Sequence, residues 1–162
     1  VGHSPPHDSV PGHDLTYQME AGLVADTTMP RTLLADLGGA ERAVTAALAL
    51  LLQRQRGGEA GCETVALAEA AEIFAEPLRY GATGAGGLLG GGIPEYGLYA
   101  CADGIVAVAC LEPHFRDGLR NALGLTALSH DGLATRFREG DAAAWNAWAR
   151  ERDLPLVASA RP

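Results

Sequence analysis

The sequence is short of positive charge. Its 162 residues include 12 Lys and Arg against 20 Asp and Glu, which gives a formal net charge of -8 at pH 7. Nucleic acids and anionic membranes are bound by clustered Lys and Arg, so neither is expected as the main partner. A phosphate-bearing ligand is not excluded, because a few local Arg side chains suffice to bind it.

Cysteine is also scarce. The three cysteines, Cys62, Cys101 and Cys110, show no C-x-x-C spacing, so the sequence offers neither a zinc-ligand pattern nor a disulfide framework. We expect buried, unreactive thiols in a cytoplasmic protein, and no metal ion.

Long apolar runs are missing as well. The richest run is broken by Gln53 and Arg54 before it reaches the length of a transmembrane helix. The first residues lack the basic segment and apolar run of a signal peptide. The chain begins without Met, in a stretch rich in Pro, His and Gly, which suggests a truncated chain or a missing upstream partner.

Glycine, in contrast, is concentrated in one segment, since residues 81–92 contain seven glycines. No Gly-Lys-Ser/Thr follows, so the segment is not a phosphate-binding P-loop. Its composition favours a flexible linker over the alternative, a loop that lies close to a ligand.

The first half of the chain predicts loops followed by helices. Residues 1–32 are interrupted by prolines and are expected to be loops. A short apolar patch at 33–35 ends at Asp36. A helix over about 42–56 is apolar almost all round and is therefore expected to be buried, and another helix is expected over about 65–78.

The second half predicts a β-hairpin followed by helices. Two apolar, strand-like runs, 98–101 and 105–111, flank Asp103-Gly104, a dipeptide typical of hairpin turns. One helix is expected to start at Pro113, because proline is favoured in the first turn, and to end at Gly124, because glycine often follows the last turn. A later helix is expected to start after Asp141, which is a typical N-cap residue.

Three ionisable residues interrupt apolar or glycine-flanked stretches and are candidates for acid/base chemistry. They are His13, Asp36 and Glu112. Asp36 and Glu112 both stand where an apolar element leads into a helix, a common place for functional residues. Taken alone, each acid is better explained as a helix N-terminal residue that the helix dipole favours, and His13 as a surface loop residue.

Five segments, in order along nearly the whole chain, resemble coenzyme A transferase family III, and specifically its α-methylacyl-CoA racemase branch. Residues 11–17 (PGHDLTY) resemble Gly-His-Asp-Ile/Leu-Asn-Tyr, and residues 30–39 (PRTLLADLGG) resemble Pro-x-Asn-Leu-Leu-Ala-Asp-Phe-Gly-Gly. Residues 91–96 (GGIPEY), 99–104 (YACADG) and 111–115 (LEPHF) are similar to Gly-Gly-Ala-Pro-Phe-Tyr, Tyr-x-Cys/Thr-Ala-Asp-Gly and Ile-Glu-Pro-Gln-Phe.

The resemblance implies that His13, Asp36 and Glu112 carry the chemistry. A racemase of 2-methylacyl-CoA removes the proton α to the thioester from one face and returns a proton to the other, which takes two acid/base groups. His13, oriented by Glu112, would serve one face and Asp36 the other.

Backbone N–H groups would bind and stabilise the enolate oxygen of the thioester. The candidates for this binding role are Gly38, Gly39, Gly91 and Gly92. Coenzyme A belongs to the substrate, so no separate cofactor is implied.

Two alternatives stay open. In the family's CoA transferases the aspartate that matches Asp36 is a nucleophile that forms a mixed anhydride, but those enzymes lack the matching His and usually the Glu-Pro pair. The chain can also be a non-catalytic remnant or a subunit that depends on a partner. Family members are about twice as long, and the turn after the apolar helix, residues 57–63, lacks the family's basic residue.

The expected fold class is α/β. Residues 1–90 would form the active-site loop and helical part of the family's large domain, and residues 91–162 a small α/β domain with the hairpin. The resemblance implies an interlocked homodimer, or a missing CoA-binding half, and a role in the metabolism of acyl-CoA lipids.

Overall fold

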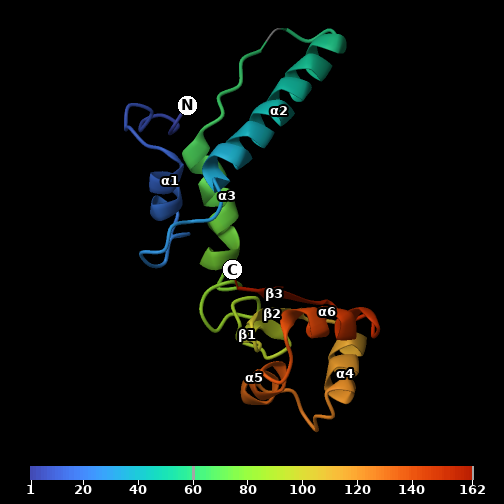
Figure 1. Ribbon diagram of the computed structural model, residues 1–162. Helices are drawn as coiled ribbons and strands as arrows, with labels where there is room; N and C mark the ends of the chain where they lie inside the picture. Colours follow the sequence, from blue (N-terminus) through green and yellow to red (C-terminus); the bar gives the residue numbers. More distant parts are fainter. Residues whose placement is uncertain (60, 162) are drawn as a thin grey trace. The chain divides into compact units, whose positions relative to one another are not determined.

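The computed structural model describes residues 1–59 and 61–161, and the chain forms two compact units, Val1–Tyr80 and Gly81–Pro162. Figure 1 labels the helices and strands of both. The fold is mixed α/β, with an all-helical first unit and a second unit that holds a small antiparallel sheet. This confirms the expected fold class. The first unit ends at Tyr80, whereas the sequence placed a domain boundary at residue 90.

The first unit is built from α1 (Asp14–Glu20), α2 (Leu34–Gln55) and α3 (Leu67–Arg79). Its small core consists of Tyr17, Ala21, Ala35, Ala71 and Ala75. Gly38 and Gly39 lie inside α2, where an added Cβ would overlap the side chains of Phe74 and Leu67 on α3. The two glycines therefore allow α2 and α3 to pack at close range.

Helix α2 corrects two predictions. It is 22 residues long and starts at Leu34, so the apolar patch, Asp36 and the two glycines all belong to it. Its buried residues are confined to Ala35, Gly38 and Gly39, whereas Val44, Leu48 and Leu51 are 57–61% exposed. In Figure 1 the C-terminal half of α2 extends beyond α1 and α3. The prediction of a buried helix was wrong because an apolar sequence does not say whether this chain supplies the covering surface.

Helix α1 also corrects the expectation of loops over 1–32. It has seven residues, and its N-cap is His13, which is not a typical capping residue. The short length and the missing capping signal explain why the sequence did not predict this helix. Helix α3 was predicted to within two residues at its start, and Pro77 lies inside it rather than ending it.

The second unit contains a three-stranded antiparallel sheet in the order β1-β2-β3. Its strands are β1 (Tyr96–Ala100), β2 (Gly104–Ala109) and β3 (Leu156–Ala160), and its helices are α4 (Pro113–Ala122), α5 (His130–Phe137) and α6 (Ala142–Arg150). The hairpin is confirmed, but Gly104 already belongs to β2, where an added Cβ would overlap the backbone of Ser159 on β3. Strand β3 and helix α5 were not predicted.

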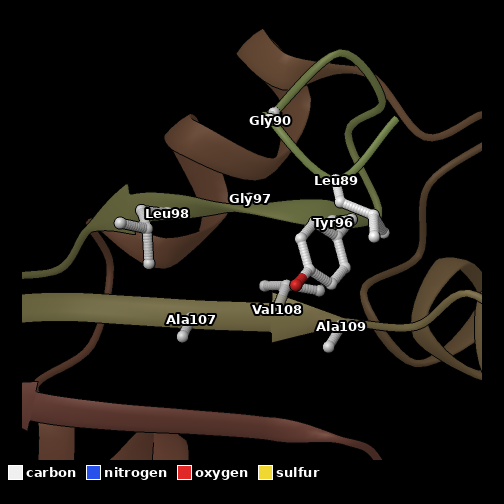
Figure 2. A pocket seen from close by; sticks show the side chains of 9 residues that line it. Leu89, Gly90, Tyr96, Gly97, Leu98, Ala107, Val108 and Ala109 are labelled. Atoms are coloured by element: carbon white, nitrogen blue, oxygen red, sulfur yellow. The ribbon is translucent and has the colours of Figure 1, made fainter. Parts of the chain in front are cut away.

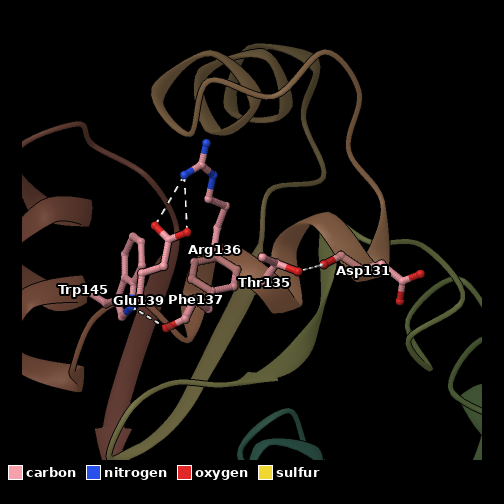
Figure 3. Close-up of polar contacts among 6 residues, drawn as sticks. All are labelled: Asp131, Thr135, Arg136, Phe137, Glu139 and Trp145. Atoms are coloured by element: carbon pink, nitrogen blue, oxygen red, sulfur yellow. Dashed lines mark hydrogen bonds and ion pairs between the residues drawn. The ribbon is translucent and has the colours of Figure 1, made fainter.

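The core of this unit lies between one face of the sheet and the helices. Val106 and Val108 of β2 point into it, with Leu119, Leu133 and Phe137 from the helices. Trp145 packs edge-on against Phe137 and donates from Nε1 to the Phe137 carbonyl oxygen at 2.9 Å (Figure 3). Burying side chains of this size contributes about 2–3 kcal/mol each, so this contact anchors α6 to α5.

The predicted helix ends of the second unit are confirmed. Pro113 is the first residue of α4, and Gly124 follows it with a φ of +65°. The Asp141 carboxylate accepts from the Ala144 N–H at 2.7 Å and caps α6. On the same helix, the Asn146 amide accepts from the N–H of Ala158 and donates to its carbonyl oxygen, both at 2.8 Å, so it binds the outer edge of β3.

The glycine-rich segment 81–92 is a folded loop, and the prediction of a flexible linker was wrong. Leu89 N donates to Ala82 O at 2.8 Å, and Gly92 N donates to Gly87 O at 2.9 Å. A Cβ added at Gly87 or Gly90 would overlap carbonyl oxygens of the same loop. The glycines thus let the backbone pack on itself, which composition alone does not distinguish from flexibility.

Candidate functional site

The Asp14 carboxylate joins the starts of α1 and α2. It is 5% exposed, and its Oδ1 accepts from the backbone N–H groups of Ala35 at 2.7 Å and Asp36 at 3.1 Å. Helix α2 begins after Leu33, whose side chain cannot cap it. Asp14, 21 residues earlier than Ala35, therefore supplies the cap, and its negative charge complements the positive end of the α2 dipole.

The second oxygen of this carboxylate is held by Gln18. Gln18 is buried, and its Nε2 donates both to Asp14 Oδ2 and to the carbonyl oxygen of Thr32 at 3.0 Å. Both carboxylate oxygens of Asp14 thus have partners, and the segment that leads into α2 is tied to α1.

His13 is fixed by its backbone, while its imidazole is exposed. Its N–H donates to the Thr16 hydroxyl oxygen at 3.0 Å, and that hydroxyl donates to the His13 carbonyl oxygen at 2.9 Å. Gly12 is required beside it, because a Cβ there would overlap the ring of Tyr17 in the core. The motif at 11–17 therefore positions a histidine at the start of α1.

Asp36 is the third residue of α2, and its side chain is exposed. Asp14 directly follows His13 in the chain and binds the Asp36 N–H. The Asp14 carboxylate therefore links the start of α1, which His13 precedes, to the start of α2, which contains Asp36. Sequence reasoning identified both but missed Asp14, whose only signal was a carboxylate inside the same motif.

Glu112 lies in the second unit, as the N-cap of α4, with an exposed side chain and an extended backbone at φ -73° and ψ 145°. Its carbonyl oxygen accepts from Arg116 N at 3.0 Å. Because Glu112 and His13 belong to different units, their convergence stays a prediction.

An ion pair between a buried Glu95 and a half-exposed Arg116 lies next to the start of α4. Glu95 is 8% exposed, and its Oε1 lies 2.8 Å from Arg116 Nε. Arg116 also donates from Nη2 to the Leu111 carbonyl oxygen at 3.1 Å. In the resemblance described above, Glu95 stands where the family segment has Phe. The signal for a pairing was a carboxylate among apolar neighbours, and the partner, 21 residues later, could not be identified from sequence.

The buried surroundings of Cys110 and Tyr99, near Glu95, disfavour the negatively charged form of both side chains. Burial, aided by the charges of Glu112 and Glu95, raises the pKa of the Cys110 thiol to about 11. Burial and then the charge of Glu95 raise the pKa of Tyr99 to about 12. Cys101 and Cys110 are buried as predicted, but Cys62 is exposed, which corrects that prediction.

A cavity of about 490 Å³ lies between the glycine-rich loop and the outer face of β1 and β2 (Figure 2). Leu89 and Gly91 line it from the loop, and Tyr96, Leu98 and Ala109 from the strands. A lining of this kind suits an apolar ligand group.

The candidate binding glycines differ in their surroundings. Gly38 and Gly39 lie in the second turn of α2, past the first N–H groups that a helix leaves unbonded, and they pack against α3. Gly91 lines the cavity with a φ of +81°, and Gly92 donates its N–H to Gly87. Among the described residues, no group of three His, Cys, Asp or Glu side chains could hold a metal ion, and no helix there is long and apolar enough to cross a membrane.

Comparison with solved structures identifies the same architecture elsewhere. The chain is similar to the hypothetical protein Rv3272 from Mycobacterium tuberculosis, at 20% identity and a TM-score of 0.78 over 99% of this chain and 51% of that one. An orthorhombic crystal form of the same protein gives 19% identity and a TM-score of 0.78 over 99% of this chain and 50% of that one. The chain thus spans about half the length of these relatives, and at this identity the likeness shows the fold alone.

A family model provides the assignment. The model of CoA-transferase family III matches residues 2–155, which is most of the chain. The match includes all five segments in which the resemblance was noted. The chain therefore belongs to CoA-transferase family III.

Proposed function

We propose that the chain belongs to the racemase branch of this family and moves the proton α to the thioester of a 2-methylacyl-CoA. His13 and Asp36 act as the two acid/base groups, and Glu112 orients His13. The observation that carries this proposal is the link through Asp14, which ties the start of α1 at His13 to the start of α2 at Asp36.

The chemistry fits the two side chains. Each is exposed, so each can reach a substrate, and each projects from a backbone held by hydrogen bonds. A fixed backbone matters because racemisation takes two groups on opposite faces of one carbon, and small displacements cost large factors in rate. Gly91 is our candidate for the N–H donor to the enolate oxygen, since Gly38 and Gly39 are occupied in helix packing.

Proton exchange tests the proposal directly. The chain is incubated in deuterated water with a 2-methylacyl-CoA, and deuterium at the α carbon is measured by mass spectrometry. We expect exchange in the parent chain and none in His13→Ala or Asp36→Ala, with Asp8→Ala, an exposed aspartate of the same unit, as the control. Exchange that survives in Asp36→Ala would remove Asp36 from the acid/base role.

CoA transfer is the second candidate, and the exposed Asp36 at a helix start is the observation that favours it. As a nucleophile, its carboxylate would attack the thioester carbonyl, form a mixed anhydride and release CoA as the thiol. Hydroxylamine traps such an acyl-aspartate, and peptide mass spectrometry locates it. A trapped adduct at Asp36, without α-proton exchange, would favour transfer over racemisation.

Affinity for the CoA part is a separate question. We propose that the chain alone binds CoA thioesters weakly, because its net charge of -8 opposes the approach of an anionic ligand. Weak binding of the non-reacting part of a substrate also slows the chemical step. Calorimetric titration with acetyl-CoA measures this, and micromolar affinity would contradict it.

A further inference from the structure

We propose that Glu95 is a positioning residue that holds Arg116 away from Glu112 and so leaves the Glu112 carboxylate free for the part that the proposed function gives it. The inference rests on the proposed function for the role of Glu112. It assigns a part in the reaction to a residue that departs from the racemase motif, which has Phe at this position, and it starts from the ion pair between Glu95 and Arg116.

The spacing creates a competitor for Glu112. Arg116 is four residues after Glu112, and acid–base pairs at this spacing, with the acid first, stabilise helices. An unrestrained Arg116 would therefore be drawn to Glu112, and a guanidinium on that carboxylate would compete with the partner that the proposed function assigns to it.

The structure directs Arg116 elsewhere. Its Nε lies 2.8 Å from Glu95 Oε1, and its Nη2 donates to the Leu111 carbonyl oxygen at 3.1 Å. Among the described residues, the ion pairs include Arg116 with Glu95 and none with Glu112. The carboxylate of Glu95 is nearly buried, whereas the Arg116 side chain is 46% exposed, so water screens the pair in part.

The position of Glu95 is fixed independently of this pair. Its carbonyl oxygen accepts from Cys110 N at 2.8 Å, so the start of β1 is bonded to the end of β2, two residues before Glu112. The charges of Glu112 and Glu95 both act on the Cys110 thiol, and His114 and Arg116 follow Glu112 in the first turns of α4. Arg116 is the cation among them that the i,i+4 spacing directs at Glu112.

Removal of the Glu95 carboxylate tests the assignment structurally. In Glu95→Leu the buried position accepts an apolar side chain, and we expect a crystal structure in which the Arg116 guanidinium lies within ion-pair distance of Glu112. Glu95→Gln keeps an acceptor without the charge and should show a mixture of both positions. An Arg116 that stays on Leu111, or turns to solvent, in both variants would overturn the proposal, whatever the catalytic activity.

Kinetics separates positioning from a merely structural role. In the α-proton exchange assay we expect Glu95→Leu to lower kcat about two- to fivefold with KM unchanged, the size expected from competition by one exposed ion pair. Glu95→Leu/Arg116→Leu should recover the parent kcat, because the competing cation is gone. Failure of that rescue would indicate that Glu95 acts only on folding. A parent chain without exchange would refute the proposed function, and the crystal structures would still decide the role of Glu95.

Discussion

Replacement of Asp14 by alanine gives the sharpest test of the first unit. The change removes the acceptor for the Ala35 and Asp36 N–H groups and leaves one of the two bonds of Gln18 unmade. A lost N-cap costs about 0.5–2 kcal/mol, and hydrogen bonds to charged groups contribute about 1.5–3 kcal/mol each. Because these overlap, we expect a loss of about 2–3 kcal/mol in the free energy of unfolding. For a unit of this size that corresponds to about 10–20 °C in Tm.

The assay can follow each unit separately. Both tryptophans, Trp145 and Trp148, lie in α6, so tryptophan fluorescence reports the second unit, whereas far-ultraviolet circular dichroism includes the helices of the first. We expect Asp14→Ala to shift the helical transition in urea and to leave the fluorescence transition in place. Asp14→Asn retains an oxygen for the two amides, so its loss should be about 1 kcal/mol. A helical transition in Asp14→Ala within 0.5 kcal/mol of the parent, as for the control Asp8→Ala, would refute the capping argument.

Three further predictions concern other parts of the molecule. Because the folded-state pKa of Cys110 is raised from 9.0 to about 11, the thiol contributes stability that is complete below pH 9 and is lost as the pH rises to 11, by an amount on the order of a few kcal/mol. Cys110→Ala should flatten the pH dependence of urea unfolding in that window, and an unchanged slope would contradict this. Gly39→Ala should lower the free energy of unfolding in urea by about 1–3 kcal/mol, because the added Cβ overlaps the Leu67 side chain. Ala43→Ser, at an exposed position of the same helix, should lower it by less than about 0.5 kcal/mol. Leu48 is 61% exposed on α2, beside the exposed Val44 and Leu51, and we expect these apolar side chains to promote self-association of the chain. Leu48→Gln should leave the free energy of unfolding unchanged and lower self-association in analytical ultracentrifugation, and equal association of both chains would contradict this.

The helix ends of the second unit could be predicted because the residues that set them act on their own local backbone. Pro113, Gly124 and Asp141 each set a helix end through their own backbone or side chain, and the structure has those ends where the sequence placed them. Strand β3, with the sequence LVASA, was missed because Ala and Ser carry little strand preference, and its place is set by pairing with β2.

The candidate site divides in the same way. His13, Asp36 and Glu112 could be named from motifs, but their local positions were predicted only in part. Glu112 is the N-cap of a helix that the sequence placed, whereas Asp36 lies inside α2 and His13 caps a helix that was not predicted. The contacts that hold them could not be named. Asp14 caps a helix that begins 20 residues later, and Glu95 binds an arginine 21 residues later, so both depend on how the chain folds back on itself.

The Asn146 amide covers the exposed edge of strand β3 by hydrogen bonds to its backbone. The N–H and carbonyl groups of Ala158 that face away from β2 are both hydrogen-bonded to the Asn146 side chain. These two groups are therefore not available to pair with a strand of another molecule. A helix side chain thus takes the place that a neighbouring strand would have at this edge. In Asn146→Leu the N–H and carbonyl groups of Ala158 would lose their partners, and the protein would become prone to edge-to-edge aggregation with little change in its core.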